Sequence, residues 1–178
     1  MISDYVKGKK QYDFPQAIQH GIKLHRAIDD FTDTHQATFE IKKIFKPAYR
    51  LYAGAFTDVV YDYFLANDSN VFASAEALKE FTQQTYTLMK PQSSCFPEKF
   101  AAMFPYMQQQ DWLYHYRFNE GMQKSFGGLA RRAKYIAETD TAYKIFLESK
   151  DYIQHWYDIF MPDVKYFTQN KIAQLLNN

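Results

Sequence analysis

Apolar residues recur along this chain at intervals of three and four, which is the spacing that keeps side chains on one face of an α-helix. One such face is formed by Ile18, Ile22, His25, Asp29 and Thr32. A second face has nearly the same rhythm and is formed by Leu51, Ala55, Asp58, Asp62 and Leu65. We find no convincing run of strict apolar and polar alternation, the pattern that would predict a strand. The pattern predicts an all-α fold with several helices.

Prolines predict where several of these helices begin. Pro15 is favoured in the first turn of a helix, so we expect a helix from about Pro15 to Asp33. A short helix at 34–45 is followed by another, which Pro47 opens and which runs to about Ala66. Residues 67–74 have the composition of a turn.

Proline and glycine also set the expected boundaries in the second half of the chain. A helix begins at Ser74 and ends at Pro91, and Pro97 begins the next helix after a loop at 92–96. The remaining expected features are a break or kink at Pro105, turns or bends at Gly121, Gly127 and Gly128, and a helical stretch at 139–176 interrupted near Pro162.

Ionisable residues interrupt both apolar faces at positions where an amphipathic helix buries apolar side chains. Lone carboxylates are costly to bury unless they are paired, protonated or bound to a metal. The two helices therefore predict an inward cluster of His25, Asp29, Asp58 and Asp62. Helix caps, solvated turns or a network paired with Arg26 would produce the same spacing, so the residues alone leave these alternatives open.

A metal ion is one explanation for this cluster. His25 and Asp29 are four residues apart, as are Asp58 and Asp62, so each helix can present two ligands to a single cation. Imidazole and carboxylate ligands suit Mn²⁺ or Mg²⁺ better than a structural zinc ion, which prefers thiolates. Such a cation polarises a phosphoryl oxygen and lowers the pKa of bound water, which makes a nucleophile near neutrality.

Composition excludes several classes of protein. The chain has 178 residues, which predicts a single domain. Its formal net charge of +1 provides no overall electrostatic field that would attract nucleic acid or an anionic membrane. A single cysteine excludes an internal disulfide and fits a reducing cytoplasm, and we see neither a secretory signal nor a membrane span.

The 15 Tyr, 16 Phe and 2 Trp residues are better explained by core packing than by base stacking. Glycine patterns for dinucleotide or P-loop binding are absent, as are GxSxG and HExxH. We expect a cytoplasmic globular protein.

Five segments resemble the acyl carrier protein phosphodiesterase family, in the same order along the chain from Asp4 to about Arg132. They are residues 3–8 (SDYVKG), residues 21–29 (GIKLHRAID) with Thr32 and Asp33, residues 58–65 (DVVYDYFL), Asp111-Trp112-Leu113 with Tyr116-Arg117, and residues 128–132 (GLARR). The resemblance implies an all-α fold whose site is related to the metal-dependent HD phosphohydrolases. It also implies hydrolysis of the phosphodiester that joins 4′-phosphopantetheine to a serine of holo-acyl carrier protein, with Mn²⁺ as the expected metal and Mg²⁺ as the alternative.

The same resemblance implies a role for individual residues. The implied catalytic residues are Asp4, His25, Arg26, Asp33 and Asp58, with Arg26 placed to meet a phosphate oxygen. The implied metal ligands are Asp4, His25, Asp29 and Asp62. The implied substrate-binding residues are Arg131, Arg132 and Lys7.

Two departures from the family pattern bear on activity. Tyr63 stands where family members usually have histidine, and tyrosine cannot replace imidazole as a neutral nitrogen ligand. Relatives also usually begin about twenty residues earlier, with a histidine-containing segment and a Gly-Asn just before the Asp4 motif. These departures keep open a non-catalytic helical module that binds acyl carrier protein or its phosphopantetheine arm. A phosphohydrolase acting on a small nucleotide is a further alternative.

Overall fold

The structure is a computed structural model that describes residues 2–177, and within them it contains helices and no strands, which confirms the all-α prediction. The α-helices are α1 (Gln16–Thr34), α2 (Gln36–Tyr49), α3 (Ala53–Ala66), α4 (Ala75–Met89), α5 (Glu98–Gln109), α6 (Trp112–His115), α7 (Asn119–Arg132), α8 (Asp140–Glu148) and α9 (Lys150–Leu176). Short 3₁₀-helices occur at η1 (Ile2–Tyr5), η2 (Gly8–Asp13), η3 (Arg50–Tyr52) and η4 (Lys90–Cys95). Among these described residues, no helix is both long enough and apolar enough to cross a membrane.

The boundary between α1 and α2 is set by backbone geometry and a side-chain cap. Pro15 has a φ of −53° and immediately precedes α1, close to the predicted start. His35 has extended backbone angles and separates α1 from α2. Its Nδ1 atom accepts a hydrogen bond from the Ala37 amide at 3.1 Å, which satisfies one of the amides exposed at the start of α2.

Several predicted breaks are wrong because tertiary packing outweighs the local signal. Pro47 lies in the last turn of α2 instead of opening the next helix, and α2 ends two residues later before Arg50, which has a φ of 47°. Pro162 lies inside α9, whose length of 27 residues is supported by contacts with α1, α2 and α3. Pro105 likewise lies inside α5.

The three glycines predicted to form turns or bends all lie inside α7. At Gly121 the reason for glycine is close approach, since a Cβ atom there would lie 1.9 Å from the His115 carbonyl oxygen. A Cβ at Gly127 or Gly128 would make only ordinary contact with the guanidinium of Arg131. The predicted loop at 92–96 is also wrong, because residues 92–95 belong to η4. Only Phe96 and Pro97 separate η4 from α5.

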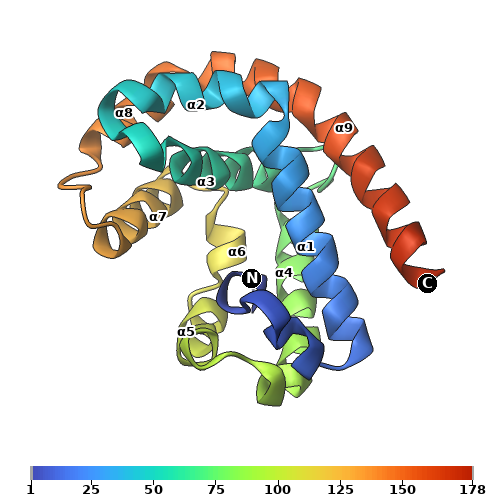
Figure 1. Cartoon of the computed structure of the whole chain (residues 1–178). Coiled ribbons are helices and arrows are strands. Elements are labelled where there is room, and N and C mark those ends of the chain that lie inside the picture. Colours follow the sequence, from blue (N-terminus) through green and yellow to red (C-terminus); the bar gives the residue numbers. More distant parts are fainter. Residues whose placement is uncertain (1, 178) are drawn as a thin grey trace.

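The main hydrophobic core lies among α2, α3, α7, α8 and α9. Figure 1 shows α2 and α9 running side by side above α3, with α7 on the other side of α3. Aromatic rings fill the centre of this core, where Phe45 stacks on Phe56 with centroids 5.6 Å apart and Phe126 meets Phe56 edge-on at 5.1 Å. These rings are fully buried, so their large apolar area contributes strongly to stability.

A second, smaller core lies between α4 and α5. Its buried residues are Tyr86, Phe100, Phe104 and Met107. The N-terminal η1 packs against both α1 and α5, and Tyr5 contacts the Phe100 ring at a centroid distance of 6.2 Å. The segment that carries Asp4 is therefore held against α1 and α5 (Figure 1).

Candidate metal and active site

Asp4, His25 and Asp29 form a group with the spacing of metal ligands. Asp4 comes from η1, whereas His25 and Asp29 lie one turn apart on α1. His25 Nδ1 is 2.9 Å from Asp29 Oδ2, and His25 Nε2 is 3.9 Å from Asp4 Oδ1. One ligand atom from each residue lies within 4.8 Å of the other two. The contact with Asp29 favours the tautomer in which Nδ1–H donates to the carboxylate, and this orients Nε2 toward Asp4.

The group faces open surface, and the prediction of an inward cluster of His25, Asp29, Asp58 and Asp62 is wrong for Asp29 and Asp58. The side chain of His25 is 34% exposed, that of Asp4 is 60% exposed and that of Asp29 is 56% exposed. Asp58 is also exposed, and Asp62 is half-buried. The physical reason is that this part of α1 is covered by the short η1 and not by a long helix, so the carboxylates keep much of their hydration.

Arg26 holds the N-terminal segment in place beside this group. Its guanidinium donates hydrogen bonds to the Val6 carbonyl oxygen at 2.6 Å and to Gln11 Oε1 at 2.9 Å. Ser3 and Val6 are both buried, so Asp4 lies in a segment that is anchored on either side. These two bonds hold the segment that carries Asp4 against α1. A contact between Arg26 and a phosphate oxygen stays a prediction.

Asp58 on α3 lies within electrostatic range of the group. Partial loss of hydration raises the pKa of Asp58 to about 6, and the negative charges of Asp33, Asp29 and Asp4 add to the rise. Lys42 acts in the opposite direction. The helices therefore bring Asp58 close to the three ligand candidates. Asp4, Asp29, Asp33 and Asp58 together form what we call the acidic surface.

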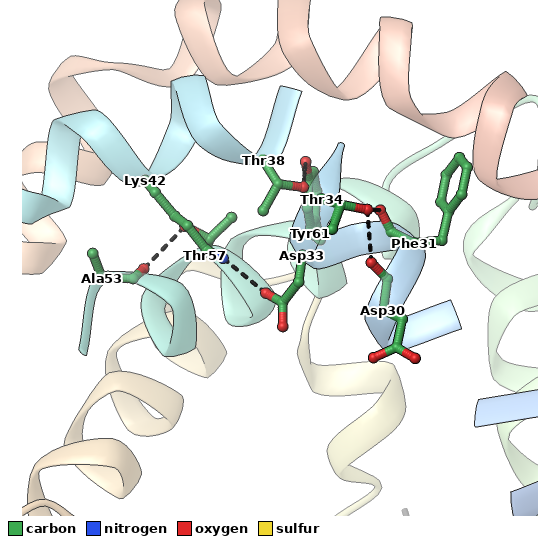
Figure 2. A network of polar contacts seen from close by, with 9 residues as sticks. All are labelled: Asp30, Phe31, Asp33, Thr34, Thr38, Lys42, Ala53, Thr57 and Tyr61. Carbon is green, nitrogen blue, oxygen red and sulfur yellow. Dashed lines mark hydrogen bonds and ion pairs between the residues drawn. The ribbon is translucent and has the colours of Figure 1, made fainter. Parts of the chain in front are cut away.

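Asp33 and Lys42 form an ion pair across α1 and α2 at the edge of this surface. Lys42 Nζ donates to Asp33 Oδ1 at 2.7 Å, as Figure 2 shows. In the same view Thr38 and Tyr61 share a hydrogen bond of 3.0 Å between α2 and α3, and Thr57 donates to the Ala53 carbonyl within α3. Asp33, expected to be catalytic, thus has a cationic partner, and no local spacing in the sequence indicated Lys42.

Asp62 lies one turn beyond Asp58 on α3 and outside the three-residue group. Burial, followed by the charge of Asp58, raises the pKa of Asp62 to about 7. Asp62 in turn raises the pKa of the Tyr116 hydroxyl, for which burial is the larger cause, and Arg132 opposes that rise. Tyr116 therefore lies within electrostatic range of both Asp62 and Arg132.

The expected substrate-binding cations lie on exposed segments. Arg131 and Arg132 are exposed at the C-terminal end of α7, where Arg132 Nε donates to the Gly128 carbonyl oxygen at 3.1 Å. Lys7 is exposed between η1 and η2, three residues after Asp4.

A family model described as acyl carrier protein phosphodiesterase matches residues 1–164 of this chain. The chain belongs to the acyl carrier protein phosphodiesterase family. No solved structure matches it.

Curated relatives of the same name cover most of the chain. The acyl carrier protein phosphodiesterase of Klebsiella pneumoniae subsp. pneumoniae is 26% identical over 96% of this chain and 89% of its own length. That of Photorhabdus laumondii is 25% identical over 89% of this chain and 77% of its own length. That of Escherichia coli O6:H1 is 30% identical over 82% of this chain and 76% of its own length.

Tyr63, where the family resemblance predicts histidine, faces away from the acidic surface. Its hydroxyl accepts a hydrogen bond from Lys150 Nζ at 2.8 Å, and its ring meets Phe146 edge-on with centroids 5.0 Å apart. Lys150 also lies over the Tyr63 ring at 4.7 Å. In this member of the acyl carrier protein phosphodiesterase family, Tyr63 therefore belongs to the contact among α3, α8 and α9. It is not a ligand at the candidate metal site of Asp4, His25 and Asp29.

The residues of the group fit a divalent cation. Two carboxylates and an imidazole already lie at ligand spacing. Burial is the main cause of the raised pKa of the nearby Asp58, and the negative charges of Asp33, Asp29 and Asp4 add to the rise. Lys42 is engaged with Asp33. A cation would relieve this repulsion.

Proposed function

We propose that this chain hydrolyses the phosphodiester that joins 4′-phosphopantetheine to the serine of a holo-acyl carrier protein. The observation that carries the proposal is the ligand-spaced group of Asp4, His25 and Asp29 in a member of this family. The curated relatives, which carry the name of this activity, support the same substrate.

We further propose that the metal is Mn²⁺, with Mg²⁺ as the alternative. Asp4, His25 and Asp29 would hold it, and Asp62 would add a carboxylate from α3. Oxygen-rich sets with one imidazole suit these hard cations. When bound, the cation supplies charge to a phosphoryl oxygen and lowers the pKa of water.

The chain's own residues then position the reactants and transfer the proton. Asp58 accepts a proton from the attacking water, a role supported by its place beside the group and by a pKa near neutrality. Water forms a new bond to phosphorus while the phosphorus–oxygen bond to serine breaks, and the serine oxygen takes up a proton. Arg131, Arg132 and Lys7 supply positive charge for the phosphate or for acidic groups of the carrier protein.

Mass spectrometry of a holo-carrier protein incubated with this chain and Mn²⁺ tests the proposal. We expect apo-carrier protein and free 4′-phosphopantetheine, and we expect a chelator to abolish the conversion. Asp29→Ala should be inactive, whereas Asp30→Ala, which changes an exposed carboxylate on the same helix, should remain active. An intact holo-carrier protein after incubation with the wild-type chain and a range of divalent metals would refute the hydrolase.

The same experiment separates the two other functions left open by the sequence. Carrier protein that binds in the presence of chelator, with no product, would identify a binding module. Turnover of a nucleotide phosphoester without turnover of holo-carrier protein would identify a small-molecule phosphohydrolase.

A further inference from the structure

An apolar cavity of about 360 Å³ begins at His25 and extends between α1, η1 and the α4–η4 segment. Its volume lies within the range of about 300–1,000 Å³ that is usual for small-molecule sites. The lining residues from η1 and α1 are Ile2, Ser3, Ile18, Gly21, Ile22 and His25. The opposite wall consists of Thr85, Met89, Gln92, Cys95 and Phe96.

One face of α1 joins this cavity to the ligand-spaced group. Ile18, Gly21, Ile22 and His25 follow one another at helical spacing, and Asp29 continues the face by one turn. On the other side, Ile2 and Ser3 line the cavity while Asp4, the next residue of η1, belongs to the group. A cation at Asp4, His25 and Asp29 would hold a phosphate at this end of the cavity, and one of the two ester substituents of that phosphate would be directed into the cavity.

The chemistry of the lining defines the substituent. Apart from His25, each of the described lining residues is uncharged at neutral pH, and most are apolar. Ser3, Thr85 and Gln92 add hydroxyl and amide groups. Such a lining favours a neutral, flexible chain that has apolar segments and a few hydrogen-bonding groups.

We propose that this cavity binds the pantetheine arm of the substrate, with the phosphate at His25 and the arm directed toward Cys95. The inference rests on the proposed hydrolase function. Beyond its phosphate, the arm is uncharged and carries a dimethyl-substituted carbon, a hydroxyl, two amides and a terminal thiol. The serine and its carrier protein then remain outside, over the exposed side of the acidic surface.

Gly21 provides a way to fill the cavity without disturbing the core. A Cβ atom at Gly21 would meet no other group within 4 Å, and helical side chains lean toward the N-terminal end of their helix, here toward Ile18. Gly21→Leu therefore obstructs the cavity, and Gly21→Ala is the matched small substitution. Both replacements favour helix relative to glycine, so neither should lower the melting temperature.

The kinetic test compares two phosphodiesters. For holo-carrier protein we expect Gly21→Leu to lower kcat/KM by about tenfold or more, and Gly21→Ala to change it by about twofold at most. For bis(4-nitrophenyl) phosphate, which has no such arm, both variants should match the wild type. Unchanged kcat/KM on holo-carrier protein, or an equal loss on both substrates, would overturn the proposal.

A second test requires no catalysis. Cys95 is the single cysteine of the chain, so its alkylation by N-ethylmaleimide reports directly on the cavity. S-methylated 4′-phosphopantetheine, which has no thiol to react, should slow this alkylation severalfold in the wild type and should produce no further slowing in Gly21→Leu. Inorganic phosphate should not protect. Equal rates with and without the S-methylated compound, or equal protection by octanol, would contradict binding of the arm.

The two tests separate this inference from the proposed function. A wild-type chain that leaves holo-carrier protein intact but whose Cys95 is protected by the S-methylated compound refutes the hydrolase and retains the arm site. A wild-type chain that hydrolyses holo-carrier protein, with Cys95 unprotected and Gly21→Leu fully active, retains the hydrolase and refutes the arm site.

Discussion

At the scale of single residues, Tyr63 shows how position within a helix decides the effect of a substitution. Its ring and hydroxyl contact Phe146 and Lys150, on a different side of α3 from Asp58 and Asp62. We expect Tyr63→His to leave Mn²⁺ affinity unchanged, because an imidazole at this position does not reach the acidic surface. The variant should lose about 1–2 kcal/mol of stability, since the contacts with Lys150 are weakened.

Denaturant unfolding and Mn²⁺ titration of Tyr63→His and Tyr63→Phe check this expectation. Tyr63→Phe keeps the ring and removes only the acceptor hydroxyl, so it should lose less stability. A marked gain in Mn²⁺ affinity for Tyr63→His would show that position 63 does face the metal.

Asp58 and Asp62 predict how the stability of the metal-free protein depends on pH. Their pKa values of about 6 and about 7 lie above the usual 3.8, so the folded state binds these protons more tightly than the unfolded chain does. Their contribution to the free energy of unfolding therefore falls as pH rises from about 4 through 7. In a chelator, we expect the wild-type melting temperature to fall between pH 5 and pH 8 by more than that of the Asp58→Asn/Asp62→Asn double variant. Parallel pH profiles for the two proteins would show that these carboxyls have ordinary pKa values.

At the scale of elements, α6 and α7 approach so closely that Gly121 has no space for a side chain. A Cβ atom would lie 1.9 Å from the His115 carbonyl oxygen. We expect Gly121→Ala to destabilise the protein by about 1–3 kcal/mol, because the backbone must shift. Gly127→Ala, on the same helix, where a Cβ atom makes only ordinary contact with the Arg131 guanidinium, should instead stabilise by about 0.5–1 kcal/mol. Urea unfolding of both variants decides the matter, and a stabilised Gly121→Ala protein would contradict this packing.

The segment from η1 to η2 depends on Arg26. Arg26→Ala removes two of the hydrogen bonds that hold this segment against α1, including the bond to Val6, which is close to Asp4, so we expect Asp4 to lose its position. We expect Mn²⁺ affinity to fall by about 10–100-fold, as is typical when a residue that orients a ligand is removed. Proteolysis near residues 6–12 should accelerate in the variant. Arg26→Lys should not restore affinity, because one ammonium cannot reproduce the two bonds of the guanidinium.

The sequence predicts a good deal of the helical architecture and part of the site. The four-residue spacing of His25 and Asp29 reports their proximity directly because both lie on α1. The position of Asp4 depends on tertiary contacts of Arg26, which spacing cannot show, and only the family resemblance indicated it. The three- and four-residue spacing of apolar residues identifies one face of a helix. It cannot show whether that face packs against the core or is covered only by a short segment, and this is why the spacing wrongly predicts an inward Asp29. The sequence predicts helix boundaries at Pro47 and Pro162, but both prolines lie inside helices. Contacts with neighbouring helices stabilise α2 and α9 across these positions.

At the scale of the whole molecule, the acidic surface lies between two separate hydrophobic clusters. The larger one positions α3, and with it Asp58 and Asp62, whereas the smaller one contacts η1, which carries Asp4. α1 contacts α2 and α9 on the side of the larger cluster, contacts η1 on the side of the smaller one, and carries His25 and Asp29. Because Asp4 and Asp29 are exposed side chains, removing either should cost little stability, and function and folding are separable by mutation at these two positions.

Titration of Mn²⁺ tests directly whether Asp4, His25 and Asp29 bind a divalent metal. The signal of free Mn²⁺ in electron paramagnetic resonance measures binding by the wild type and by Asp4→Ala, Asp29→Ala and Asp30→Ala, with thermal melts in chelator to verify folding. We expect Asp4→Ala and Asp29→Ala each to weaken binding by about tenfold or more while melting like the wild type, and Asp30→Ala to bind normally. Equal Mn²⁺ affinity in all four proteins would contradict the site, and a much lower melting temperature for Asp29→Ala would instead identify these carboxylates as part of the scaffold.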